Sequence, residues 1–579
     1  MPTWKLTAGT LEAVIELTDG GELTLEARHD GRPVIAASRL GLRAAHADLT
    51  DGLAFDSITE RAVDESYRTM IGKSRDHHHT ATEWTLTFSK GTDRLLLQIQ
   101  LGDQGIGYRY QVPWSGPVTV CEEISGYVID PEARAILLPY DNGRCDYEEI
   151  QHQTTVGRAE PIRYGYPALF GLGDELWLMI TESGLDGGYA GSRLGFDGTV
   201  FSLDLPDAYV TAASPLITPW RTMIIGSLGS IVASDLITGL APPSRVPDTS
   251  WIKPGPAAWS WWSDGPSSWD PEAQRRWIDF AAEVGWPYVL LDSGWHRDWA
   301  PEVIAYAKEK GIGVWLWTHW QHVDTELEHR EKLELWKEWG AVGIKIDFTE
   351  SDGQERMRWF DSILAATARI GLMVVFHGGT IPRGTERTWP QFLSAEAVKG
   401  AEWIKPKPGK EPLYPPTHYL ALAFTRNVQG PMDFTPCTFS AVRTISAGFE
   451  LALSVIFESG IQHFADSMEV YRSMPEATAL LSRVPVAWDE TRLLSGDPAD
   501  HIVLARRHGA DWYVGAGITG AARALTVPLD FLDAGDWTAE LYADADGDRI
   551  ARTTTQVAAG AVLEIPVADN GGCTIRLTR

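Results

Sequence analysis

Cysteine is scarce in this chain, and its scarcity argues against two kinds of site. Only four of the 579 residues are cysteines, and no two of them form a CxxC pair; they stand at positions 121, 145, 437 and 573. Such scattered positions indicate neither a zinc site nor a framework of disulfide bonds. We therefore expect neither in the folded protein.

Positive charge and long apolar runs are also lacking. Fifty Lys and Arg face 78 Asp and Glu, which gives a formal net charge of -28. Because phosphate binding is built from clustered Lys and Arg, nucleic acid and anionic membranes are poor partners. No run of roughly eighteen apolar residues occurs, and the first residues lack the basic and apolar blocks of a signal peptide. We expect a cytoplasmic protein, and the chain leaves open whether a leader was removed.

The length and the patterning indicate several domains rather than one core. Up to about residue 240, short segments alternate apolar and polar residues between Gly, Asp and Pro, as in 95–101 and 176–181. Alternation with period two and frequent turns is typical of antiparallel sheets. A stretch dense in proline follows. We predict an N-terminal β domain over 1–245 and a linker over 246–257.

Beyond the linker, apolar runs alternate with amphipathic helical patterns. Helix-like segments at 270–284, 301–310, 325–339 and 354–370 separate the earlier strand-like runs, which are 257–262, 288–293, 313–318, 341–348, 372–377 and 461–465. Apolar strands that alternate with helices indicate parallel β/α units, and their number suits an eight-fold barrel over 258–488. Two-residue alternation then returns, which predicts a small β domain over 489–579.

Polar residues follow several of the barrel strands, where active groups cluster in this fold. The fourth strand ends on Asp347, with Lys345 two residues earlier on the same face. Glu396 and Glu402 follow a later strand. Cleaving a glycosidic bond requires one group to protonate the leaving oxygen and another to stabilise or attack the anomeric carbon. Asp347 and Glu402 therefore look like the carboxyl pair of a glycoside hydrolase.

Other side chains at these strand ends are candidates for binding a sugar. The 25 tryptophans are many for this length, and flat indole faces stack on sugar rings as well as filling cores. Each candidate has a structural alternative: an ion pair for Lys345, a turn cap for Asp292, and a core histidine bonded to backbone for His377. The expected substrate-binding residues are Asp292, Trp295, Lys345, His377, Trp259 and His319.

An ordered set of motifs makes the sequence resemble glycoside hydrolase family 97. They include GIKIDF at 343–348, FHGG at 376–379, PRGTERTWP at 382–390, the segment 396–402, PTH at 416–418, GPMDFTP at 430–436 and, upstream, 107–110, 180–183 and 218–221. The resemblance implies an N-terminal β-supersandwich, a central (β/α)8 TIM barrel and a C-terminal small antiparallel β-sandwich.

The family has an inverting and a retaining branch, and this chain resembles the retaining one. Inverting members carry a Glu directly after the fifth-strand His, whereas here Gly378 follows His377 and Asp347 ends strand four. The resemblance implies that Asp347 is the nucleophile and that Glu402 is the acid/base. It also implies that Glu182 and Glu396 bind Ca²⁺, an ion that prefers six to eight oxygen ligands.

These observations predict a retaining exo-α-glycosidase that removes terminal α-galactosides from oligosaccharides or small glycosides. Retaining β-L-arabinopyranosidase and α-glucosidase activities of the same family are the alternatives. A third alternative, from another class, is an inactive carbohydrate-binding protein, although both carboxyls are present. The sequence does not fix the number of subunits, so a homo-oligomer stays possible.

Overall fold

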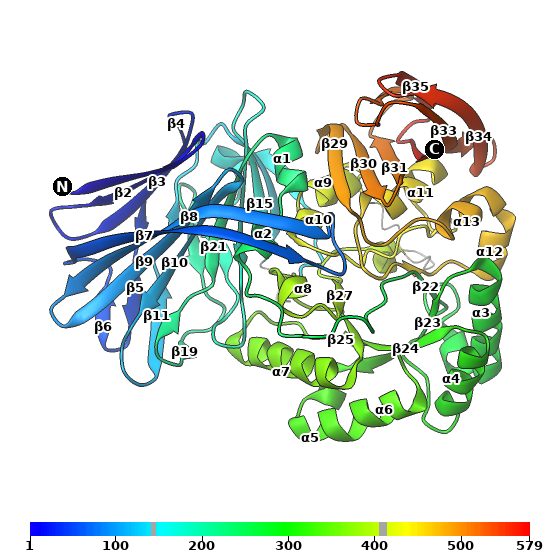
Figure 1. Ribbon diagram of the computed structural model, residues 1–579, viewed down its shortest axis with the longest axis horizontal. Coiled ribbons are helices and arrows are strands. Elements are labelled where there is room, and N and C mark those ends of the chain that lie inside the picture. The colour runs from blue at the N-terminus through cyan, green and yellow to red at the C-terminus, as the bar shows by residue number, and fades with distance from the viewer. Residues whose placement is uncertain (141–145, 405–413) are drawn as a thin grey trace.

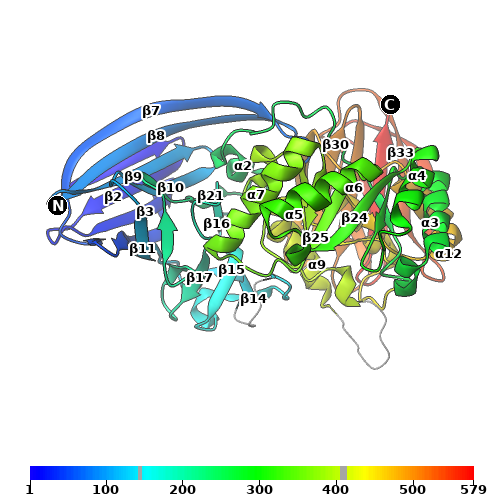
Figure 2. The same ribbon diagram turned by 90° about the horizontal axis from the view of Figure 1, so that it is seen from below.

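The computed structural model describes residues 1–140, 146–404 and 414–579. The N-terminal sheets lie at one end of the molecule, and the β/α unit and the C-terminal sheets lie together at the other (Figures 1 and 2). Cys145 is outside the described residues, and the other three cysteines are free thiols. No helix in the described part of the chain is long and apolar enough to cross a membrane.

Three antiparallel sheets make up the N-terminal part. Two helices, α1 (Leu228–Ala233) and α2 (Leu236–Leu240), follow them. The four-stranded sheet contains β1 (Thr3–Ala8), β2 (Leu11–Leu17), β3 (Leu23–His29) and β4 (Arg32–Leu40). The large sheet contains β7 (Ala54–Arg68), β8 (Asp76–Lys90), β9 (Asp93–Gly102), β10 (Gly105–Val112), β12 (Gly126–Tyr127), β13 (Arg134–Pro139), β14 (His152–Thr155), β15 (Arg163–Gly171), β16 (Trp177–Ser183), β17 (Arg193–Phe196), β18 (Phe201–Asp204), β20 (Leu216–Ile217) and β21 (Trp220–Gly226). The third contains β5 (Leu42–Ala44), β6 (Ala47–Leu49), β11 (Val118–Glu123) and β19 (Val210–Ala212).

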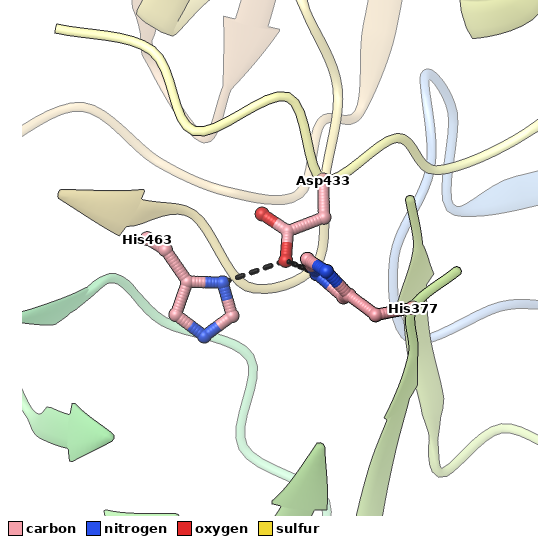
Figure 3. A group of neighbouring side chains, drawn as sticks. All are labelled: His377, Asp433 and His463. Atoms are coloured by element: carbon pink, nitrogen blue, oxygen red, sulfur yellow. Dashed lines mark hydrogen bonds and ion pairs between the residues drawn. The ribbon is translucent and has the colours of Figure 1, made fainter. Parts of the chain in front are cut away.

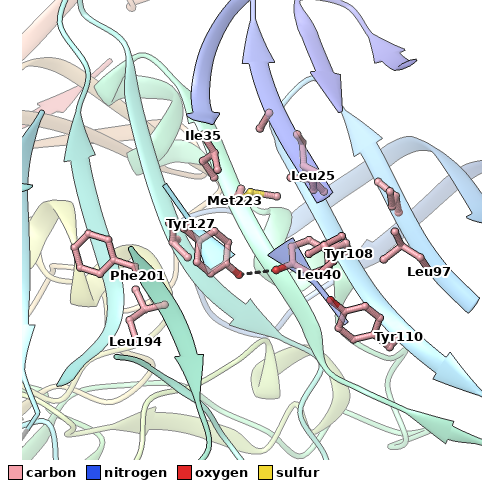
Figure 4. Close-up of a cluster of buried hydrophobic side chains, with 14 of the residues drawn as sticks. Leu25, Ile35, Leu40, Leu97, Tyr108, Tyr110, Tyr127, Leu194, Phe201 and Met223 are labelled. Atoms are coloured by element: carbon pink, nitrogen blue, oxygen red, sulfur yellow. Dashed lines mark hydrogen bonds between the residues drawn. The ribbon is translucent and has the colours of Figure 1, made fainter. Parts of the chain in front are cut away.

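One hydrophobic core lies between these sheets. Every second residue of β2 is buried, as expected of a strand with one face on a core. Leu25 and Leu97, from different sheets, belong to the same buried cluster (Figure 4). Tyr108 and Tyr127 also belong to it, and the hydroxyl of Tyr108 donates a hydrogen bond to that of Tyr127 at 3.0 Å. The expected β-supersandwich is confirmed.

A buried arginine links three strands of this domain, β11, β16 and β21. Arg221 of β21 binds Glu123 at 2.7 Å and Glu182 of β16 at 2.6 Å, and all three side chains are inaccessible to solvent. Removing one partner leaves buried charge uncompensated, which typically costs about 3–5 kcal/mol. We expect Arg221→Ala to lower the free energy of unfolding by that amount in urea denaturation. Arg28→Ala, at a partly exposed pair, serves as the control, and an equally small effect for both variants would contradict this expectation.

The middle of the chain forms a curled parallel sheet with helices along its outer side (Figures 1 and 2). In the described residues its strands are ordered β27, β26, β25, β24, β23, β22, β28. In chain order the elements are β22 (Ala257–Trp259), α3 (Pro271–Val284), β23 (Tyr288–Leu291), α4 (Ala300–Glu309), β24 (Gly313–His319), α5 (Glu326–Glu328), α6 (Glu334–Trp339), β25 (Gly343–Asp347), α7 (Gln354–Ile370), β26 (Met373–Phe376), α8 (Thr385–Thr388), β27 (Phe392–Ala395), α9 (Pro416–Phe424), α10 (Arg426–Gln429), α11 (Ala447–Ile456), β28 (His463–Phe464), α12 (Met468–Ser473) and α13 (Pro475–Leu481).

This sheet has the predicted β/α architecture, with one difference from eight regular strands. After β27, the described chain continues the sheet only by a single parallel bridge between Ala395 and Met432. Capping residues at the helix ends set where helices and strands alternate. Asp270 caps the start of α3 by accepting the N–H of Glu272, and Gly285 ends α3 in the left-handed conformation at φ 80°. Helix α3 therefore ends there, and the chain continues into β23.

The C-terminal part contains two antiparallel sheets around a common core, which agrees with the expected small β-sandwich. The larger sheet orders its strands β29, β30, β31, β36, β33, β34, and the smaller one pairs β32 with β35. Their bounds are β29 (Glu490–Asp497), β30 (His501–His508), β31 (Asp511–Ile518), β32 (Arg523–Pro528), β33 (Asp536–Ala545), β34 (Arg549–Ala558), β35 (Val562–Val567) and β36 (Gly572–Thr578).

Candidate active site

A cavity of about 440 Å³ opens where the parallel strands end. Asp347 closes β25, Glu396 directly follows β27, and Glu402 lies on the short 3-10 helix η5 (Ala401–Ile404). All three carboxylates line the cavity. The other lining residues are Asp146, Glu148, Trp259, Trp261, Asp292, Ser293, Trp317, Lys345, Phe348, Glu350, Gly378 and Trp403. The structure thus brings the two predicted catalytic acids to one cavity.

Two donors hold the carboxylate of Asp347. The indole N–H of Trp317 donates to Oδ2 at 3.0 Å, and the backbone N–H of Phe348 donates to Oδ1 at 2.7 Å. Burial raises the pKa of Asp347, while the charges of His377 and Lys345 and the Trp317 bond act to lower it. Hydrogen bonds that favour the charged form also fix its orientation. Asp347 is therefore a fixed carboxylate that faces the cavity.

The backbone around Asp347 leaves room only for a glycine at position 378. Gly378 has φ 49°, and an added Cβ would lie 3.0 Å from both Asp347 Oδ1 and the Phe348 nitrogen. Phe348 itself adopts φ 62°, which is unusual for a bulky residue and is found most often at functional sites. A glutamate at 378 would therefore collide with the carboxylate of Asp347.

Glu402 lies close to several charged side chains. Its Oε1 lies 3.6 Å from Lys345 Nζ and 3.5 Å from His377 Nδ1, and within the described chain this oxygen accepts no hydrogen bond. Burial raises the pKa of Glu402 to about 8, and the carboxylates of Glu396 and Asp347 act in the same direction. A carboxyl that keeps its proton at neutral pH is suited to act as a general acid.

His377 lies below the cavity in a buried chain of hydrogen bonds (Figure 3). Its Nε2 is 2.6 Å from Asp433 Oδ2, and the same oxygen lies 2.7 Å from Nδ1 of His463. Its Nδ1 is 3.1 Å from Glu396. Burial lowers the pKa of His377, but the charge of Glu396 and the hydrogen bonds with Asp433 and Glu396 together outweigh it, so the pKa stands well above the ordinary value. The sequence motifs included Asp433 without assigning it a role, and they did not include His463.

Lys345, Asp292 and Trp259 form a polar corner of the cavity. Lys345 Nζ lies 3.6 Å from Asp292 Oδ2 and 3.9 Å from the centre of a Trp259 ring. Trp259 also donates its indole N–H to Asp292 at 2.8 Å. Asp292 accepts the N–H of Ser293 as well, so it caps a turn and faces the cavity at once. Such convergent polar groups beside aromatic rings are typical of ligand pockets.

Three predicted sugar-binding residues do not line the cavity: His377, which lies behind it, and also Trp295 and His319. Trp295 donates its indole N–H to the carbonyl of Trp317 at 2.8 Å and therefore supports the residue that holds Asp347. His319 stacks on Phe348, with ring centres 5.2 Å apart, and accepts the N–H of Gln321. Both side chains support residues of the cavity wall, and their direct contact with a sugar stays a prediction.

Glu182 is bonded by two arginines, and its role as a Ca²⁺ ligand stays a prediction. Its oxygens take bonds from Arg221, from Arg383 and, at 2.6 Å and 3.0 Å, from the hydroxyl and N–H of Ser192. It does not line the cavity. Glu148, which the sequence reading did not single out, lines the cavity together with Glu396. Burial raises the pKa of Glu148 to about 10, and the charges of Glu396 and Asp146 contribute.

Three family models match the chain in order. The glycosyl-hydrolase 97 N-terminal model matches residues 8–243, the glycoside hydrolase 97 model matches 251–398, and the glycosyl-hydrolase 97 C-terminal, oligomerisation model matches 487–578. Together they cover more than half of the chain. The order of these matches is that of the three parts of the fold.

Relatives agree with these matches. The chain is 39% identical to a probable retaining alpha-galactosidase of Streptomyces bingchenggensis, over 95% of this chain and 88% of the relative. It is 26% identical to a retaining alpha-galactosidase of Bacteroides thetaiotaomicron, over 93% and 90%. A solved beta-arabinopyranosidase, 25% identical, superposes with a TM-score of 0.90 over 98% of both chains. A family 97 enzyme from Pseudoalteromonas sp. strain K8 in complex with panose, at 24% identity and TM-score 0.91 over 99% and 100%, shares the fold. The chain thus belongs to glycoside hydrolase family 97 and is a retaining glycoside hydrolase.

Proposed function

We propose that this enzyme hydrolyses terminal α-galactosides by double displacement, with Asp347 as nucleophile and Glu402 as acid/base. The observation that carries the proposal is the pair of carboxyls that line one cavity. Burial raises the pKa of both, that of Glu402 to about 8, while the two N–H donors to Asp347 favour its ionised form. A retaining glycosidase needs one ionised and one protonated carboxyl at the same bond.

In this scheme the first step forms a bond and breaks a bond at the anomeric carbon. Asp347 attacks that carbon while Glu402 gives its proton to the departing oxygen, so that the leaving group departs as an alcohol. In the second step Glu402, now ionised, takes a proton from water as the water attacks the glycosyl ester. Galactose leaves with its configuration retained, and both carboxyls return to their starting states.

The similarity to two retaining alpha-galactosidases supports galactose as the glycone. A second candidate is β-L-arabinopyranose, because a solved beta-arabinopyranosidase superposes closely and because this pentose has the ring stereochemistry of galactose without the exocyclic CH₂OH. Lys345 and Asp292 are proposed to hold the sugar hydroxyls next to Trp259.

A set of nitrophenyl glycosides tests the glycone. We expect kcat/KM for the α-galactoside to exceed that for the β-L-arabinopyranoside by about 10-fold or more, since the exocyclic group adds contacts in a closed pocket. The α-glucoside differs by one axial hydroxyl and should be poorer still. Faster hydrolysis of the arabinopyranoside would overturn the galactoside assignment and leave the catalytic pair unaffected.

Calcium is proposed to bind Glu396 together with Glu148, in place of the expected pair of Glu182 and Glu396. Both residues are carboxylates that line the same cavity, which suits an ion that prefers oxygen ligands. Their mutual repulsion contributes to the raised pKa of Glu148, and a divalent cation would relieve it. When bound, the ion would supply positive charge that polarises a sugar hydroxyl.

Calorimetric titration with Ca²⁺ tests this ligand pair without relying on activity. Glu148→Gln and Glu396→Gln are each expected to weaken Ca²⁺ binding by about 10-fold or more, because each removes one charged ligand. Asp174→Asn, an exposed acid of the N-terminal domain, is the control and should bind like the wild type. Unchanged affinity in both Gln variants would contradict the proposed ligands.

The match of 487–578 to a model described as an oligomerisation domain supports a homo-oligomer. We propose that the C-terminal sandwich contributes to its interface.

A further inference from the structure

A buried chain of polar contacts crosses from the N-terminal domain into the β/α unit. Arg383, on the segment before α8, reaches Glu182 of β16 at 2.5 Å and Asp352 at 3.1 Å. All three side chains are 3% exposed or less. Gly191 of the N-terminal domain lies so close that an added Cβ would be 2.8 Å from the Arg383 guanidinium. The two domains are therefore fixed to each other at this point.

Asp352 also binds Tyr147 of the N-terminal domain. Its Oδ2 accepts the hydroxyls of Tyr147 at 2.8 Å and Tyr140 at 2.5 Å. Tyr147 is 2% exposed and has φ 62°, and its ring packs so tightly on β15 that a Cβ added at Gly165 would lie 2.9 Å from it. The ring, the hydroxyl and the backbone of Tyr147 are all constrained.

The two residues after Tyr147 contact the segment that carries the acid. Glu148 Oε2 accepts the indole N–H of Trp403 at 2.6 Å, and Glu149 Oε2 lies 3.6 Å from Lys399 Nζ. Lys399 also lies 4.8 Å from the centre of a Trp403 ring. Trp403 is next to Glu402 on η5. Two side chains of the N-terminal segment 147–149 thus contact Trp403 and Lys399, which lie next to Glu402 in the sequence or just before its helix.

We propose that the Arg383–Asp352–Tyr147 chain is a positioning device through which the N-terminal domain holds Glu402 in line with the leaving oxygen. This inference rests on the proposed acid/base role of Glu402. Proton transfer in the transition state requires hydrogen-bond geometry, so small displacements of the acid slow it strongly. Asp347 is held by Trp317 and the Phe348 N–H instead, so the device acts on the acid and not on the nucleophile.

The test uses leaving groups that differ in their need for a proton. Tyr147→Phe keeps the ring and removes only the hydroxyl that joins Asp352. With a methyl glycoside of the accepted sugar, whose alkoxide must be protonated, kcat/KM should fall by about 10-fold or more. With the corresponding glycosyl fluoride, which leaves with little help from an acid, the change should stay below about 2-fold.

Tyr164→Phe is the matched control. It also removes one tyrosine hydroxyl from the N-terminal domain, and among the described residues that hydroxyl bonds only the carbonyl of Glu160, at 2.8 Å. It should behave like the wild type with both substrates. Equal losses of Tyr147→Phe on both substrates, or no loss on either, would overturn the proposal.

A variant at the other end of the chain keeps the proposal testable if Tyr147→Phe folds poorly. Trp403→Phe removes the N–H that bonds Glu148 and should give the same selective loss on the methyl glycoside. If both variants fold, the double variant should lose no more than the worse single one, because the two act through one path. Additive losses would contradict a shared path. Glu402→Ala distinguishes failure of the acid/base assignment from failure of the positioning proposal. If Glu402→Ala slows both substrates equally, the acid/base assignment of Glu402 is wrong, whatever the result for Tyr147→Phe.

Discussion

Replacing Asp347 by alanine is expected to lower kcat on a nitrophenyl α-galactoside by about 10,000-fold, because the step that forms the covalent intermediate loses its nucleophile. The rest of the cavity is held by other contacts, since Lys345, Asp292 and Trp259 bind one another and not Asp347. Substrate affinity should therefore change much less than turnover.

Azide separates a missing nucleophile from a damaged pocket. Azide fits the space that the carboxylate leaves and attacks the anomeric carbon from the same side. We expect it to restore turnover of Asp347→Ala and to yield a β-galactosyl azide. Asp292→Ala is the matched control, since it removes another cavity carboxylate. Its turnover should rise with substrate concentration and should not be restored by azide. Rescue of Asp292→Ala instead of Asp347→Ala would show that Asp347 is not the nucleophile.

Glu402→Gln is expected to give the second large effect, one that depends on the leaving group. With a methyl α-galactoside the loss in kcat/KM should reach about 1,000-fold, within the range for removal of a general acid. With the galactosyl fluoride it should be about 10-fold or less. A uniform loss over both substrates would mean that Glu402 supports the fold or the sugar and does not donate a proton.

The pH profile provides an independent readout of the same residue. The acid works only in its protonated form, and burial raises the pKa of Glu402 to about 8. The kcat/KM of the wild type on the methyl galactoside should therefore be maintained below that pH and fall as the pH rises through it. Glu402→Gln carries no titrating group and should lack this alkaline limb. A limb that persists unchanged in the variant would have to come from another group.

Much of the barrel, and the placement of Asp347 and Glu402 at one cavity, was predictable because both leave local signals. Apolar strands that alternate with amphipathic helices have two different periods, and the boundaries of α3 and α7 fall within one residue of the predicted 270–284 and 354–370. Asp347 and Glu402 were found because strand ends meet at one edge of such a sheet. Neither inference requires knowledge of long-range packing.

The surroundings of Glu182, Glu148, Trp295 and His319 could not be predicted in the same way. Glu182 lies on β16 with its carboxylate turned toward Arg221 and Arg383, and strand periodicity does not say which buried partner a side chain meets. Glu148 lies outside any helix or strand, in an acidic stretch with no period, so only the fold brings it to the cavity. Trp295 and His319 do follow or end strands, but indole and imidazole groups serve there as supports for Trp317 and Phe348.

Covalent labelling of the nucleophile tests the central claim most directly. A fluorinated galactosyl fluoride forms the glycosyl ester but slows its hydrolysis, so the intermediate accumulates and can be located by mass spectrometry of peptides. The account predicts one added fluorogalactosyl group, on the peptide that contains Asp347 and on that residue. A label on any other residue would contradict it, as would a fully active enzyme that acquires no label.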